Sequence, residues 1–545
     1  MAGNNLTDVD GKLAAAGITI TAPGVSGSAE SLGPELKLRT PGGQLLHNAL
    51  ANSGLSARTH IALGHSTAAT GPVTISVPAP APGSNALLLI HDSTGALSWH
   101  VPDGIIPRSS ETVRLPPGSV AASAGGGVTA SAAESAAAAA EPAAAPTVSF
   151  TVPASRFAAG NKHAGLLSRI AGLVEHFHFH PGLGSASKVL SVVEYPVEHL
   201  VGELGAKWFA DWEHNKHPSV VRWFPAEGNL SVGEPLSPTN WHQLAGGPTL
   251  LFIHGIFSSC EAGFAGIGHD DSTWPQLRER YGNRDGSRII GFDHPTGSVG
   301  PAENAEWFLD QIPKKVELDL DIVCHSRGGL VARSIAVRAA QRGMSVNIRR
   351  IVFAATPNGG SQITVTANWV GLVNRISSVL TLPAKVLPAP ADAISGVLAG
   401  LLEVLKIVGV GVALDLPGLE AMTPGSQFLQ GLGQATNVTP EYFAAAADFE
   451  PGPVLANLFN GLDDEGRVVD SAIFDHIHND IAVPTEGVWN PASITYPNSP
   501  ATPIPGFPID DPARRLVIGP GSVYWHCDYF DDPAMRAALL QWLPG

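Results

Sequence analysis

Residues 321–333, which read DIVCHSRGGLVAR, give the strongest indication of the fold. An apolar run that ends at Val323 predicts a short buried strand, and a helical pattern begins soon after it. Ser326 lies between the two, and the small residues Cys324 and Gly328 flank it two positions away on either side. A sharp turn from strand to helix strains its apex residue and brings the flanking chains so close that only small side chains fit. The pattern therefore predicts a serine hydroxyl that is lifted clear of a sheet, at the start of a helix.

The usual form of this turn is Gly-x-Ser-x-Gly, and here Cys324 replaces the first glycine. Cysteine is small enough to fit the same position. Taken alone, Ser326 could equally be an N-cap residue, because serine is a preferred cap of helices. The interpretation therefore depends on what surrounds the turn in the sequence.

Four other segments of the sequence contain further motifs, which follow one another in a definite order along the chain. They are residues 248–257 (PTLLFIHGIF), 353–361 (FAATPNGGS), 479–484 (NDIAVP) and 523–530 (VYWHCDYF), and a helical pattern ends in LLQWL at 539–543. Together with the serine turn, this series resembles the α/β-hydrolase superfamily, and within it the bacterial lipases and esterases. The resemblance covers about residues 245–545 and implies a mostly parallel sheet that is flanked by helices.

The resemblance also implies roles for individual residues. Ser326 would be the nucleophile, His526 its base and Asp480 the carboxylate that holds the histidine, in the chain order typical of this fold. A serine hydroxyl needs a neighbouring base to take its proton, and the imidazole needs a carboxylate to orient it. The backbone N–H groups of Ile256 and Arg327 would form the oxyanion hole.

Two other aspartates, Asp470 and Asp475, lie close to Asp480 in the sequence and are alternatives for the acid. Residues 475–480 (DHIHND) also fit a solvated loop or, less well, a metal site. We expect the other histidines near the motifs to be structural: His325 packs under the turn and His254 fixes a loop. The alternating His176, His178 and His180 fit a half-exposed helix end or strand better than a metal site, and we predict no metal and no cofactor.

An apolar insertion gives a hint about the substrate. Between Trp369 and about Gly433 the sequence is dominated by Val, Leu, Ile and Ala, with one helical stripe at Leu398, Leu401, Leu402, Leu405 and Val408. Glu403 and Lys406 interrupt the run before it reaches membrane-spanning length. We predict an apolar lid or cap over about residues 362–433, a buried structural helix being the alternative. We expect substrate contacts from Phe257, Leu401 and Leu405.

The rest of the chain divides by composition. Residues 1–120 predict a small β-rich accessory domain, with an alternating strand at 73–77 and a hairpin at 86–101. Residues 121–147 are nearly all Ala, Gly, Ser and Pro and predict a linker. Residues 148–240 are expected to pack on the catalytic domain, which would span 241–545.

Charge and cysteine content set outer limits. The net charge of −16 and the lack of a basic cluster argue against a nucleic-acid partner. Three cysteines, Cys260, Cys324 and Cys527, cannot make a disulfide framework and are expected to be small packing residues. The N-terminal residues lack the pattern of a signal peptide, which predicts a cytoplasmic location, although export by another route leaves no such mark. The oligomeric state stays open.

The sequence thus predicts a serine-dependent hydrolase of hydrophobic carboxylic esters or acyl lipids, with transient contact to a lipid surface. An acyltransferase or an amidase would use the same triad, and only the acceptor or the scissile bond would tell them apart. A non-catalytic interaction protein that keeps the fold is the alternative from a different class.

Overall fold

The structure is a computed structural model of the 545-residue chain. It describes residues 12–23, 25, 29–33, 41–64, 71–92, 96–104, 146–154, 186–197, 203–224, 233–283, 286–364, 369–379, 391–409, 416–433, 440–449, 478–494, 504–522 and 525–545. The predicted linker lies almost wholly outside these residues, as do Asp470, Asp475 and the three alternating histidines at 176–180.

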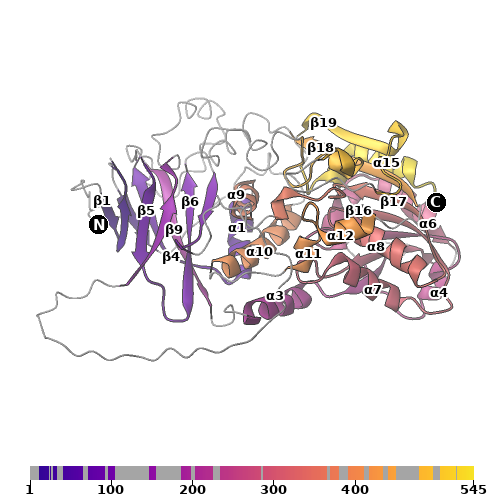
Figure 1. Cartoon of the computed structure of the whole chain (residues 1–545), viewed down its shortest axis with the longest axis horizontal. Coiled ribbons are helices and arrows are strands. Elements are labelled where there is room, and N and C mark those ends of the chain that lie inside the picture. The colour runs from indigo at the N-terminus through magenta and orange to yellow at the C-terminus, as the bar shows by residue number, and fades with distance from the viewer. Residues whose placement is uncertain are drawn as a thin grey trace, which may run out of the picture.

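An eight-stranded sheet forms the C-terminal part of the molecule, seen on the right of Figure 1. Its strands, in spatial order, are β11 (Glu234–Pro235), β10 (Val220–Phe224), β15 (Ile289–Asp293), β12 (Pro248–Ile253), β16 (Leu318–His325), β17 (Val346–Ala354), β18 (Glu441–Phe449) and β19 (Arg515–Ser522). The strands from β15 to β19 are parallel, whereas β10 pairs antiparallel with both β15 and the edge strand β11. The predicted mostly parallel sheet is confirmed.

Helices cover both faces of this sheet, and alternate strand residues point to each face. On β12, Leu251 and Ile253 pack in one apolar cluster, whereas Leu250 and Phe252 pack in another. The helices α7 (Pro301–Gln311) and α8 (Gly328–Gln341) bury their apolar faces in the first cluster; α6 (Thr273–Tyr281) and α15 (Pro533–Trp542) bury theirs in the second. Because both faces are buried, these strands read as continuous apolar runs in the sequence. We call this sheet and its helices the α/β unit.

The N-terminal part is a sandwich of two antiparallel sheets (Figure 1, left). One sheet has the order β1 (Lys12–Ala15), β2 (Ile18–Thr21), β5 (Val73–Pro78), β8 (Thr147–Val152), and the other β3 (Ala29–Gly33), β4 (Ser56–Gly64), β9 (Ala186–Pro196), β6 (Ser84–Asp92), β7 (Leu97–His100). A core cluster lies between them, with Ile75 and Phe150 from the first sheet and Leu88 and Leu190 from the second. The predicted hairpin at 86–101 is present as β6 and β7.

The five-stranded sheet of this N-terminal sandwich is buried on its second face as well. Leu87, Leu89 and Trp99 alternate with the inward residues and join the same cluster as one face of the α/β unit. The helices α1 (Pro41–Asn52), α9 (Trp369–Val379) and α10 (Ala391–Val408) lie here: α10 packs on α1 and α9 packs on β7. Figure 1 shows these helices between the two parts of the molecule. The two parts therefore share a core.

This architecture corrects the predicted domain boundaries. Residues 148–240 were expected to pack on the catalytic domain, and helix α3 (Glu203–Lys216) does so through Phe209. The strands differ: β8 pairs with β5, and β9 lies between β4 and β6, in the N-terminal sandwich. Conversely, β10 and β11 belong to the α/β unit, so that unit begins before residue 241. The prediction failed because a strand's own residues carry its period but not the identity of its partner.

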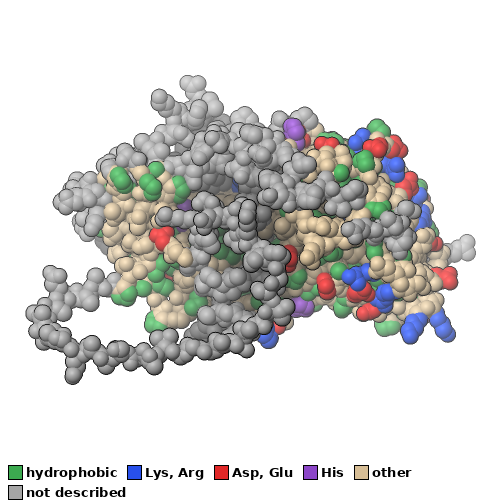
Figure 2. All heavy atoms as spheres, in the orientation of Figure 1, with side chains coloured by type: hydrophobic (Ala, Val, Ile, Leu, Met, Phe, Trp, Pro, Cys, Tyr) green, Lys and Arg blue, Asp and Glu red, His purple; other side chains and the backbone are tan. Residues whose placement is uncertain are grey.

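Charged side chains gather unevenly on the face shown in Figure 2. Lys and Arg lie among Asp and Glu, mainly over the α/β unit, where Arg342 pairs with Glu306 and Asp310. Among the described helices, none combines the length and the apolar character that crossing a membrane requires.

Candidate active site

Ser326 occupies the predicted sharp turn between β16 and α8. Its φ is 53°, in the left-handed region that non-glycine residues seldom adopt. The turn is as tight as the small-residue pattern predicts: a Cβ on Gly328 would clash with the carbonyl oxygen of Ile253, and one on Gly255 would lie 2.8 Å from the Cβ of Ser326. Cys324 is fully buried, and its thiol donates to the carbonyl of Val352 (3.2 Å). Cysteine is therefore accommodated where the usual pattern has glycine.

The structure brings Ser326, His526 and Asp480 together. The Oγ of Ser326 lies 2.7 Å from Nε2 of His526, and Nδ1 of His526 lies 3.0 Å from Oδ2 of Asp480. Their loops follow three different strands of the sheet, and all three residues are buried. Parallel strands deliver their carboxyl ends to one edge, which explains why residues 46 and 200 positions apart meet. The geometry allows a proton to pass from the serine to the histidine.

Asp480 is held as an ionised acceptor. The backbone N–H groups of Ala482 and Val483 donate to its Oδ1 (3.0 and 2.7 Å). Burial alone would raise the pKa of this carboxyl, but the contact with His526 and these N–H bonds lower it below its usual value. An ionised Asp480 fixes the histidine with a proton on Nδ1, which leaves Nε2 free to accept from the serine.

Tyr529 is a further partner of this carboxylate that sequence reasoning did not single out. Its hydroxyl donates to Oδ2 of Asp480 (2.9 Å) and accepts from the backbone N–H of Ala447 (2.6 Å). The residue lies within the histidine segment quoted above, three positions after His526. Its spacing alone gave no reason to prefer it to its neighbours, because its two partners come from other segments of the chain.

The two predicted oxyanion donors flank the serine. Arg327 follows Ser326 at the N-cap of α8, where backbone N–H groups lack partners within the helix. Ile256 lines the same pocket as Ser326, on the loop after β12. Within the described part of the chain, neither N–H donates to another residue. Both N–H groups are therefore available as hydrogen-bond donors, as the predicted oxyanion role would require.

The two neighbouring histidines have other partners. His325 is buried and its Nε2–H donates to the carbonyl of His526 (2.6 Å), so it helps to hold the segment that carries His526. In His254, Nε2 accepts from the backbone N–H of His294 (3.1 Å) and Nδ1 lies 2.7 Å from the carbonyl of Gly255. Burial lowers the pKa of His254 to about 4 and of His325 to about 3, so both are neutral near pH 7. Their placement agrees with structural roles.

An apolar pocket opens at Ser326 and His526. It is walled by residues from α9 and α10 and from the loops of the sheet edge: Ile256, Leu372, Ile376, Val397, Leu401, Met422, Ile481, Val483 and Trp525. The insertion that was predicted as a lid therefore supplies one wall of the pocket. Among the described residues, no group of three His, Cys, Asp or Glu side chains is placed to hold a metal ion.

Of the three predicted substrate contacts, Leu401 lines this pocket, whereas Phe257 and Leu405 are not among its lining residues. Phe257 is buried against Gly400 of α10 and stacks edge-on with Phe209, 6.1 Å away. Leu405 lies one helical turn beyond Leu401 on the same stripe of α10, and at that position its side chain packs in the core and not in the pocket. Of the three cysteines, Cys260 and Cys324 are buried, and Cys527 is partly buried and lines the pocket; burial raises the pKa of all three thiols.

The family described as "Domain of unknown function (DUF7379)" matches residues 217–544. No curated protein matches the chain.

Solved structures that resemble the chain include three hydrolases. The mature lipase BlEst2 of Bacillus licheniformis is 17% identical over 59% of this chain and 97% of its own, with a TM-score of 0.30. Phospholipase PlaB of Legionella pneumophila is 10% identical over 44% of this chain and 45% of its own, with a TM-score of 0.28. The NocB thioesterase domain is 13% identical over 56% of this chain and 98% of its own, with a TM-score of 0.27.

Proposed function

The chain belongs to the DUF7379 family, whose description names no function, and we propose that it is a serine-dependent carboxylic ester hydrolase. One observation carries this proposal: in the chain of contacts Ser326–His526–Asp480, both Ser326 and His526 line an apolar pocket. A buried carboxylate, an oriented imidazole and a serine hydroxyl in mutual contact form the set of groups that acyl transfer requires.

The proposed reaction has two steps. In the first, His526 takes the proton of Ser326 as its Oγ attacks the ester carbonyl, and the N–H groups of Ile256 and Arg327 bind the developing oxyanion. The same proton then passes to the leaving alcohol, and an acyl-enzyme remains. In the second step His526 deprotonates a water that attacks the acyl-enzyme, which releases the carboxylic acid and restores the serine.

The pocket supports a hydrophobic acyl group as the substrate. Most of its lining residues are apolar, Ser258, His325, Ser361 and Thr364 being polar exceptions outside the triad, and none of the lining residues is Asp, Glu, Lys or Arg, so the pocket offers no carboxylate, ammonium or guanidinium partner to a charged acyl chain. The helices α9 and α10 are proposed as the cap over this acyl chain, and esters at a lipid surface as a natural source of substrate.

Turnover of p-nitrophenyl esters tests the proposal. We expect the wild type to hydrolyse them, Ser326→Ala to lose a factor on the order of 10⁴ or more, and Asp480→Asn to lose less. Full activity of Asp480→Asn would move the acid role to another carboxylate.

Two controls separate the rival reactions. A matched p-nitroanilide tests for an amidase, and product analysis with an added alcohol tests for an acyltransferase. If the folded wild type turned over none of these substrates, the non-catalytic alternative would be favoured.

A further inference from the structure

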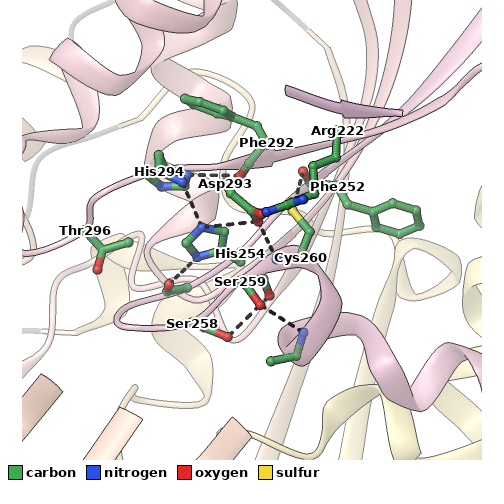
Figure 3. A network of polar contacts seen from close by, with 12 residues as sticks. Arg222, Phe252, His254, Ser258, Ser259, Cys260, Phe292, Asp293, His294 and Thr296 are labelled. Carbon is green, nitrogen blue, oxygen red and sulfur yellow. Dashed lines mark hydrogen bonds and ion pairs between the residues drawn. The ribbon is translucent and has the colours of Figure 1, made fainter. Parts of the chain in front are cut away.

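The loop that follows strand β15 contacts both segments that carry the oxyanion donors. On one side, the backbone N–H of Phe257 donates to Oγ1 of Thr296 (2.9 Å). On the other, the fully buried guanidinium of Arg327 donates to the carbonyl of Val299. Figure 3 shows Thr296 on this loop, beyond His294. One loop, residues 294–299, thus joins the two halves of the proposed oxyanion hole.

A buried carboxylate holds this loop. Glu213, on helix α3 (Glu203–Lys216), is fully buried and accepts from the backbone N–H groups of Thr296, Gly297 and Ser298 at 2.7–2.8 Å. It also accepts from the hydroxyls of Thr296 (3.1 Å) and Ser298 (2.6 Å). Burial alone would raise the pKa of Glu213, but these bonds lower it below its usual value. An ionised group with five donors holds the loop firmly in one conformation.

The direction of these bonds matters at Thr296. Its hydroxyl has one proton, which it gives to Glu213, so the oxygen is left as an acceptor for the N–H of Phe257. Glu213 therefore orients the hydroxyl, and the hydroxyl orients the Phe257 peptide.

Phe257 needs such support because of its backbone conformation. Its φ is 48°, in the left-handed region, which costs roughly 1 kcal/mol or more in a residue with a bulky side chain. The N–H that donates to Thr296 belongs to the peptide group between Ile256 and Phe257. The N–H of Ile256 belongs to the preceding peptide group. A change at φ of Phe257 or in the plane of the peptide between Ile256 and Phe257 would turn the Ile256 donor away from the serine.

The same loop region also holds the residue before Ile256. The N–H of His294 donates to Nε2 of His254, which fixes the imidazole with its proton on Nδ1, and Nδ1–H then donates to the carbonyl of Gly255. Figure 3 shows this imidazole between the two segments, with Asp293 on its other side. The donor loop is therefore held on both sides of Ile256.

We propose that Thr296, oriented by Glu213, is a positioning residue for the oxyanion hole. It holds the left-handed turn at Phe257, so that the N–H of Ile256 is aimed at the oxyanion before the substrate binds. This inference rests on the proposed hydrolase function. Since the oxyanion forms only during the reaction, in the tetrahedral intermediate and the transition states that flank it, and is absent from the bound substrate, Thr296 should affect turnover more than substrate binding.

The test compares two substitutions at the same position. Thr296→Val keeps the shape of the side chain and removes the acceptor, whereas Thr296→Ser keeps the hydroxyl. We expect kcat of Thr296→Val to fall about 10- to 100-fold, because a displaced donor costs somewhat less than a deleted one. KM should stay within about twofold, and Thr296→Ser should restore most of kcat. Rates are expressed per site titrated with a fluorophosphonate, so that unfolded chains do not contribute.

An inhibitor that forms a tetrahedral adduct with the serine distinguishes this positioning role from a purely structural one, because a purely structural role would leave its inhibition constant unchanged. The inhibition constant of a trifluoromethyl ketone should rise by the same factor as kcat/KM falls, since its adduct places an oxyanion in the hole. Glu213→Gln is the second variant, because an amide N–H₂ in place of one oxygen would face the loop N–H donors. We expect Glu213→Gln to lower kcat, as Thr296→Val does.

Two results would overturn the inference while the proposed function stands. One is an active wild type with Thr296→Val and Thr296→Ser equal in kcat per titrated site. The other is a raised KM at unchanged kcat in Thr296→Val, which would indicate uniform substrate binding. A wild type that neither hydrolyses esters nor reacts with the fluorophosphonate would instead overturn the proposed function itself.

Discussion

Ser326, Cys324 and Gly328 show why the sharp turn could be predicted from the sequence. The close approach of neighbouring backbone limits the size of each flanking side chain, so the constraint appears in the sequence as a short pattern of small residues. The roles of Tyr529, Thr296 and Glu213 could not be predicted in this way. Each acts through hydrogen bonds to residues 39 or more positions away. A tertiary partner at that separation leaves no periodic mark near the residue itself.

Tyr529 leads to a prediction at the same scale. Tyr529→Phe removes one donor to Asp480 and leaves the N–H of Ala447 without its acceptor. We expect kcat to fall by about tenfold with KM unchanged, and the free energy of unfolding to fall by about 1–3 kcal/mol. Steady-state kinetics and urea unfolding measure the two effects. An unchanged kcat would show that Asp480 orients His526 without this bond.

At the scale of elements, helix α10 was predicted from its apolar stripe, and a helix is present at Ala391–Val408. The stripe did not reveal that the helix is buried on more than one side, with the pocket on one face and α1 on another. Glu403 and Lys406, which interrupt the apolar run in the sequence, form a buried ion pair with Nζ and Oε2 2.7 Å apart. Lys406 also donates to the carbonyl of Ser53 and lies over the ring of Trp208. Periodicity gives one apolar face; it does not give the partners of the others.

Two leucines on α10 provide a matched pair. Leu401→Phe enlarges a side chain that lines the pocket, so we expect the ratio of long-chain to short-chain ester turnover to fall about tenfold. Leu405→Ala removes core packing one turn away and should cost about 2–5 kcal/mol of stability while leaving that ratio unchanged. The measurement is kcat/KM for butyrate and dodecanoate esters. Equal chain-length profiles in both variants would contradict the assignment of the pocket.

Glu403 predicts a pH-dependent stability. Burial raises the pKa of this carboxyl to about 7, with Lys406 opposing the rise. Between pH 4.5 and about 7 the folded chain therefore holds a proton that the unfolded chain has released, and this group's contribution to stability falls as pH rises. We expect Glu403→Gln to gain stability relative to the wild type over this window, by up to about 3 kcal/mol.

Urea unfolding at pH 4.5 and pH 7 measures this gain. Glu420→Gln, at an exposed glutamate on helix α11 (Pro417–Glu420), is the matched control and should show no such difference. If the stability gap between Glu403→Gln and the wild type were the same at both pH values, Glu403 would not titrate in this range.

At the scale of the whole molecule, the N-terminal sandwich is part of the pocket's support. Helix α9 presents Leu372 and Ile376 to the pocket, and its Asn374 accepts from the backbone N–H of Trp99 on β7 (2.6 Å). The hydroxyl of Ser377 accepts from the indole N–H of the same tryptophan (3.0 Å). One wall of the pocket is thus fastened to the other half of the chain. The sequence could not predict this, because the composition of residues 1–120 indicates strands but not the surface they cover.

Asn374 tests this connection. Asn374→Ala leaves the buried N–H of Trp99 without an acceptor, so we expect a loss of about 1–3 kcal/mol in the free energy of unfolding. Because α9 would be held less firmly, KM should rise for a dodecanoate ester but not for an acetate ester. Asn215→Ala, at an exposed asparagine of α3, is the control for both readouts. A KM that rose equally for both esters would contradict the claim that the sandwich supports the acyl pocket through α9.

The most direct measurement is the mass of the folded protein after reaction with a fluorophosphonate, determined by mass spectrometry for the wild type and for Ser326→Ala. The reagent bonds to a serine only where its base and oxyanion donors are assembled. We predict one adduct per wild-type chain, located on the peptide that contains Ser326, and none on the variant. An unlabelled but folded wild type, or an adduct that persists in Ser326→Ala, would contradict the assignment of Ser326 as the nucleophile.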